Sequence, residues 1–225
     1  MTDSNAGRRL AGVLLLSSLV AMILGAALVV PSGLTLNPAD PAAALAAVSE
    51  QAGLHLAELA FDVLGWLGLT AAGLVMGASA GGAGLVMGAG AGGAPRPYLV
   101  VLAGGLLAAA GVAGLLHDAG NLALTQLSPV PAVAGAVLLT AKWMVNLAGL
   151  LWAAATVAAA AGVPMPAGLR RAGFCAALFG LAAVVLPWTA GAEGVPVAVE
   201  QLGYALQLPV VLWYGLLGWR FLRRG

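Results

Sequence analysis

The chain has 225 residues, of which 62% are apolar and only 8% are charged, and its formal net charge at pH 7 is +1. Soluble domains carry about 25% charged residues, so this composition excludes an ordinary soluble domain and predicts an integral protein of the lipid bilayer. The small net charge also argues against nucleic acid as a partner, because polyanions are bound by strongly basic surfaces.

Six apolar runs are long enough to cross a bilayer, for which a helix needs about 20 residues. They cover approximately residues 10–30, 54–76, 98–125, 132–161, 172–190 and 197–217. We therefore predict an all-α polytopic bundle, a single membrane domain over residues 1–225 with six transmembrane helices. The first run follows Arg8 and Arg9, as a signal peptide would. It exceeds the roughly 7–15 apolar residues of a signal sequence, so we expect it to be retained.

The arginines fix the expected orientation. In a six-span order all eight fall on one side of the membrane, at Arg8, Arg9, Arg96, Arg170, Arg171, Arg220, Arg223 and Arg224. An order of five or seven spans would scatter them over both sides. Because positively charged loops stay inside, both termini are predicted to be cytoplasmic, in the inner membrane of a bacterium.

Two connecting segments have a recognisable composition. Asp40 followed by Pro41 is typical of an N-cap and first helical position, so a short surface helix is expected before the second span. Residues 77–97 are rich in glycine and low in complexity. This composition predicts a flexible cytoplasmic linker between the second and third spans.

Four of the predicted spans carry polar side chains along one face. At about 100° per residue, His55, Glu58 and Asp62 fall within an arc of roughly 60° on the second span. Polar side chains that face lipid are costly, so these four faces are expected to meet in a shared interior. With a rise of about 1.5 Å per residue, most of them reach similar depths in the outer half of the bilayer. The predicted buried polar cluster consists of Asp62, His117, Asp118, Asn121, Lys142, Asn146 and Gln207.

A vestibule is expected to lead from the outside to this cluster. Its predicted lining is His55, Glu58, Glu200 and Tyr204.

Charge in this layer is unbalanced, because the only lysine of the chain, Lys142, shares it with Glu58, Asp62 and Asp118. These carboxyl groups cannot all be ionised cheaply in a low-dielectric interior, so either some are protonated or a histidine is charged. Two interpretations of Lys142 remain open. It forms a clasp with an acidic residue that fixes helix register, or it belongs to a working site.

The leading functional interpretation is a structural or sensory membrane component that is not an enzyme. The alternative is a small-solute or proton-linked transporter that uses Asp62, Asp118 and Lys142 near the midplane. Spans four to six do not repeat the polar pattern of spans one to three, which disfavours a transporter built from inverted repeats.

A metal-dependent membrane enzyme is a further alternative, because histidine and carboxylate side chains suit several metals. Its candidate ligands are His55, Glu58, Asp62, His117 and Asp118. Against this alternative, Lys142 would repel a cation, and His55 lies about 10 Å above Asp62 on its helix. A haem between His55 and His117 is disfavoured because their depths differ. With Cys175 as the single cysteine, thiol-based metal motifs are also excluded, so no cofactor is predicted.

Short motifs along the chain resemble those of a known family. They are RLAGVLLL at residues 9–16, an acidic second span at Glu58, VPMPAGLRR at residues 163–171 and EQ at residues 200–201. Together they resemble a large family of bacterial six-helix membrane proteins known only as a domain of unknown function, although the glycine-rich segment departs from its pattern. The resemblance implies the six-span topology and assigns no catalytic residue.

Overall fold

A computed structural model describes residues 2–32, 34, 36–86, 96–127, 130–189 and 195–224. In these ranges every regular element is helical. The six long helices are α1 (Thr2–Val29), α3 (Ala52–Val86), α4 (Pro97–Ala123), α5 (Pro131–Gly162), α6 (Ala167–Val185) and α7 (Val197–Arg224). The shorter elements are η1 (Val30–Ser32), α2 (Pro41–Glu50), η2 (Leu124–Gln126) and η3 (Leu186–Thr189).

Six of the described helices are long and apolar enough to cross a membrane, which supports the prediction of a multi-pass membrane protein. Large apolar side chains also cover their outward faces, for example Leu64, Leu178 and Leu212, which are 59%, 67% and 52% exposed. Such apolar outward faces are compatible with contact with lipid.

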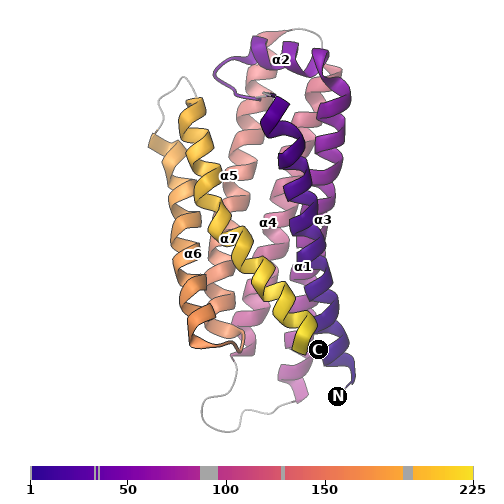
Figure 1. Ribbon diagram of the computed structural model, residues 1–225, viewed down its shortest axis with the longest axis vertical. Helices are drawn as coiled ribbons and strands as arrows, with labels where there is room; N and C mark the ends of the chain where they lie inside the picture. The colour runs from indigo at the N-terminus through magenta and orange to yellow at the C-terminus, as the bar shows by residue number, and fades with distance from the viewer. Residues whose placement is uncertain are drawn as a thin grey trace.

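The long helices form a closed ring (Figure 1). Each packs on its neighbour in the chain, and α7 packs back on α1. Both termini lie at one end, here called the terminal end, and α2 lies across the opposite end, here called the α2 end. Helix α7 runs obliquely and crosses α1 near the terminal end. Lateral contact between α5 and α7 is small, because α6 lies between them in the ring.

Glycine allows the backbones of neighbouring helices to touch. A Cβ atom added to Gly12 of α1 would lie 2.7 Å from the carbonyl oxygen of Gly218 in α7. One added to Gly73 of α3 would lie 2.5 Å from that of Gly104 in α4. Small residues at helix contacts favour association inside membranes, where no hydrophobic effect draws helices together.

Aromatic rings fill the interior of the ring toward its terminal end. The ring centroids of Trp66 and Trp152 lie 5.9 Å apart, and those of Trp152 and Tyr214 also lie 5.9 Å apart. These three side chains come from α3, α5 and α7 and are buried. The interior toward the terminal end is therefore packed with side chains, and the polar residues lie toward the α2 end.

Two predictions about connecting segments have different outcomes. The short surface helix is confirmed as α2, and the Asp40 side chain caps it by accepting from the Ala43 N–H at 3.0 Å. The linker was placed wrongly at its start, because α3 continues as a helix to Val86. Small residues such as Gly77 let this part of α3 pack against α4, and this contact overrides the weak helix propensity of glycine. Residues 87–95 of the predicted linker lie outside the described part of the chain.

Candidate functional site

Polar side chains from four helices lie toward the α2 end of the ring, most of them turned inward although Tyr204 is 66% exposed, and we call this set the polar layer. Its members are His55, Glu58, Asp62, His117, Asp118, Asn121, Lys142, Glu200 and Tyr204. The layer contains three groups of contacts, which are described in turn.

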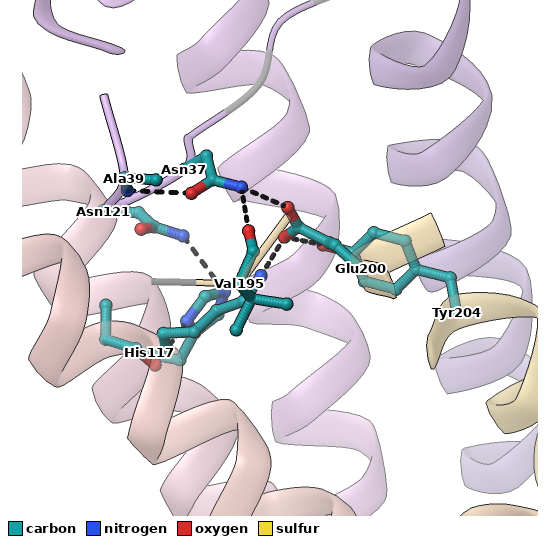
Figure 2. A network of polar contacts seen from close by, with 9 residues as sticks. Asn37, Ala39, His117, Asn121, Val195, Glu200 and Tyr204 are labelled. Atoms are coloured by element: carbon teal, nitrogen blue, oxygen red, sulfur yellow. Dashed lines mark hydrogen bonds and ion pairs between the residues drawn. The ribbon is translucent and has the colours of Figure 1, made fainter. Parts of the chain in front are cut away.

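Glu200 is the centre of the first group (Figure 2). Its Oε1 atom accepts hydrogen bonds from the Lys142 ammonium and, at 3.0 Å, from the Tyr204 hydroxyl. Its Oε2 atom accepts from the Asn37 side-chain amide at 3.3 Å. The Lys142 Nζ atom also lies 5.8 Å from the centroid of the Tyr204 ring, within the range of a cation–π interaction. We call these four residues the Glu200 clasp.

The clasp joins parts of the fold that otherwise have little contact. Lys142 is on α5 and Glu200 on α7, which are separated in the ring by α6, and the two side chains are only 16% and 12% exposed. Asn37 belongs to the segment before α2. Its amide also donates to the Val195 carbonyl at 2.7 Å, and its Oδ1 atom accepts from the Ala39 N–H at 2.8 Å. The clasp therefore fastens α7 to α5 and to the segment that leads into α2.

Two histidines and one asparagine form the second group, which joins α3, α4 and α5. The His117 Nδ1 atom lies 2.8 Å from the Ala141 carbonyl oxygen, which only accepts, so Nδ1 carries a hydrogen. In neutral His117 the Nε2 atom then accepts from the Asn121 side-chain amide at 3.0 Å. The His55 Nε2 atom lies 3.1 Å from the Asn121 backbone oxygen and must likewise be a donor. These contacts fix the tautomer of each neutral ring.

Three carboxyl groups form the third group, which we call the carboxyl cluster. Glu58 and Asp62 lie on α3 and Asp118 on α4, near enough for their charges to interact. Asp118 is 1% exposed, and neither of its carboxyl oxygens has a hydrogen-bond partner within the described residues. Helix α1 covers Asp62, since a Cβ atom on Gly25 would lie 3.0 Å from the Asp62 Oδ1 atom.

His55 connects the second group to the carboxyl cluster. Its side chain is fully buried, and its Nδ1 atom lies 3.7 Å from the Glu58 Oε2 atom. The His55 Nδ1 atom has no hydrogen-bond partner in the described residues.

The structure distributes the predicted site residues differently from the sequence analysis. Lys142 pairs with Glu200, which was assigned to the vestibule, and not with Asp62 or Asp118. The depth estimates treated the helices as parallel, whereas α7 runs obliquely and brings its first turn toward α5.

Asn146 and Gln207 lie against α6 and not with the carboxyl cluster. The Asn146 amide donates to the Val184 carbonyl at 2.9 Å and its oxygen accepts from the Trp188 indole at 3.1 Å. A Cβ atom on Gly180 of α6 would lie 3.5 Å from the Gln207 side-chain oxygen. Asn146 lies one turn farther along α5 than Lys142, and its partner Val184 lies in the last turn of α6.

Sequence reasoning missed Asn37, which supplies a donor to Glu200. The signal was present as an asparagine ahead of the Asp40 cap, because asparagine side chains commonly bond the backbone two residues on. Asn37 does so with Ala39.

Within the described ranges no three histidine, cysteine, aspartate or glutamate side chains converge in a way that would hold a metal ion. His117 engages both ring nitrogens in hydrogen bonds within the protein.

The fold and the layer together define a class: a ring of six helices of membrane-spanning length with a polar interior toward one end. No protein-family model, no curated protein and no solved structure matches this chain. The family resemblance drawn from the short motifs stays a prediction.

Proposed function

We propose that this protein is a multi-pass component of a bacterial cytoplasmic membrane with both termini inside and the polar layer in the outer half of the bilayer. The proposal is supported by the arginines, which flank the helices at the terminal end. The opposite end carries Asp40 and Glu50 on and beside α2. This asymmetry follows the rule that positively charged segments remain on the cytoplasmic side.

We further propose a structural or sensory role rather than an enzymatic one, and the observation that carries it is the Glu200 clasp. One carboxylate collects donors from α5, from α7 and from the segment before α2. A buried ion pair is stable when both partners are present and costly when either is removed or neutralised. In this proposal the clasp has two states: closed, it holds α7 and the outer segment on α5, and open, it releases both.

Such an element suits a membrane protein that responds to conditions on the outer side. Anything that neutralises Glu200 or competes for Lys142 favours the open state by the difference in its affinity for the two states. Helix α7 ends at the terminal end, so a change in its position is transmitted across the bundle.

A double-mutant cycle on the clasp tests this proposal. Lys142→Met and Glu200→Met should each lower the free energy of unfolding by about 3 kcal/mol, because each leaves an unpaired buried charge. The double variant should recover most of the loss, which appears as a large coupling energy between the two positions. Unfolding is followed by titrating the purified protein with a denaturing detergent in mixed micelles.

Arg171→Met is the matched control, because it removes a charge from an exposed position at the start of α6. Its effect should stay within about 0.5 kcal/mol. The clasp proposal is wrong if Lys142→Met unfolds like the unaltered protein, or if the losses of the two single variants simply add.

A further inference from the structure

The carboxyl cluster is separate from the Glu200 clasp. The Lys142 ammonium and the Tyr204 hydroxyl donate to Glu200, and no hydrogen bond or ion pair within the described residues joins either of them to Glu58, Asp62 or Asp118. The titratable and charged groups around the cluster, by element, are His55 on α3, His117 on α4, Lys142 on α5, and Glu200 and Tyr204 on α7.

Helix α1, which also packs on α3, adds no titratable side chain at this level. It contributes Gly25 beside Asp62, and Ser18, whose hydroxyl donates to the Gly65 carbonyl at 2.6 Å. On the side of α1, therefore, no cationic side chain faces the carboxyl cluster.

The ring of neutral His55 carries only one N–H hydrogen, although both of its nitrogen atoms face an oxygen atom. Its Nε2 atom must carry a hydrogen to bond the Asn121 oxygen, so neutral His55 turns the Nδ1 lone pair toward Glu58, 3.7 Å away. An ionised Glu58 would place two acceptors against each other. One added proton, on either group, would turn this repulsion into attraction, and a small approach from 3.7 Å would then bring the two atoms within hydrogen-bond distance.

Asp118 requires a proton for a different reason. Its side chain is 1% exposed, and both oxygens lack a hydrogen-bond partner among the described residues. An ionised carboxylate that is buried without donors carries a large desolvation cost, and such a group neutralises instead. The nearby charges of Asp62 and Glu58 add repulsion to that cost.

We propose that Glu58, Asp62 and Asp118, together with the Nδ1 atom of His55, form a proton-binding site inside the membrane, supplied from the aqueous phase at the α2 end. Glu58, 18% exposed, is the entry, and Asp118 is the inner acceptor. On binding, a hydronium ion gives up one O–H bond, a new O–H bond forms on a carboxylate oxygen, and water is released. This binding role goes beyond the structural role of the clasp and does not depend on it.

Infrared spectroscopy of the full-length protein in lipid nanodiscs tests the site, because protonated carboxyl groups have a C=O stretch distinct from that of carboxylates. At neutral pH the unaltered protein should show a protonated carboxyl band that exchanges slowly in heavy water. Asp118→Asn should lose the slowly exchanging part of the band, and Glu58→Gln should reduce its total intensity. Glu50→Gln, an exposed change on α2, should leave the band unchanged.

Absence of the band from the unaltered protein would overturn the proposal, as would a band that neither cluster variant changes. Glu58→Gln keeps the test decisive if Asp118→Asn does not fold, because Glu58 is partly exposed. Addition of Na⁺ or Ca²⁺ at fixed pH should leave the band unchanged. Its loss with release of protons would assign the cluster to a metal cation and reject the proton site.

Discussion

Exchanging Glu200 for glutamine should destabilise the protein far more than exchanging Asp118 for asparagine. Both changes replace a carboxyl group with an amide of nearly the same shape inside the polar layer. Their surroundings differ, because Glu200 accepts from three donors, whereas Asp118 has no hydrogen-bond partner within the described residues.

The expected magnitude for Glu200→Gln follows from its partners. An amide has one acceptor oxygen, so its NH₂ group must face either Lys142 and Tyr204 or Asn37, all of which donate. The Lys142 ammonium, 16% exposed, also loses its counter-charge. Removing one partner of a buried pair costs about 3–5 kcal/mol, and the residual exposure places this change near 3 kcal/mol.

Asp118→Asn removes no hydrogen bond and leaves the volume almost unchanged. If Asp118 is protonated, as proposed, the change also removes no charge. Substitutions that conserve shape in a core cost less than about 1.5 kcal/mol. The new amide has nearly the same shape as the protonated carboxyl group and, like it, no hydrogen-bond partner within the described residues, so the net effect should lie near zero.

The assay is unfolding in mixed micelles at neutral pH, with Glu50→Gln as an exposed control for the change from carboxyl to amide. Equal losses for Glu200→Gln and Asp118→Asn would refute the reasoning. That result would mean that Asp118 is ionised and held by a cation, and the layer would then not divide into a paired and an unpaired part.

Two further predictions concern packing and orientation. Gly104→Leu should lower the free energy of unfolding by about 1–3 kcal/mol, because its Cβ atom would lie 2.7 Å from the Gly77 backbone nitrogen. Gly105→Leu is the control, because its Cβ atom would meet nothing within 4 Å, and it should be neutral or stabilising in the same assay. In a Cys175→Ala background, a membrane-impermeant maleimide should label Glu50→Cys in intact cells and Arg171→Cys only after permeabilisation. The reverse order would invert the proposed orientation.

The fold was predictable where the determinants are local. Span length follows from the thickness of the bilayer, and the cap of α2 follows from Asp40 and Pro41, so both could be read directly from the sequence. The segment after Gly77 could not, because its composition is equally compatible with a flexible linker and with a helix of small residues. Contact with α4 decides between them, and composition contains no information about that contact.

Which polar side chains turn toward the bundle interior was largely predictable, but Asn146 and Gln207 contact α6 instead of the carboxyl cluster, and the pairings were not predictable. The cost of facing lipid indicates which helix faces turn inward, and this requires only periodicity. The partner of Lys142 depends on the oblique course of α7 and on the segment that contains Asn37, which are properties of the assembled bundle. Asn146 shares a helical face with Lys142, but its amide donates to Val184 in the last turn of α6.

The division of the layer into two parts resolves the imbalance between one lysine and several acids. Lys142 forms an ion pair with Glu200, and the Glu200 carboxylate also accepts a hydrogen bond from Tyr204. A bundle that needed only packing would be as stable or more so with apolar residues in place of buried charged groups. The clasp has a structural use that explains its charges, since it joins α7, α5 and the segment before α2. The carboxyl cluster joins nothing through Asp118, whose oxygens have no partner in the described residues. Its acids are therefore better explained by the protons they bind than by the helices they hold.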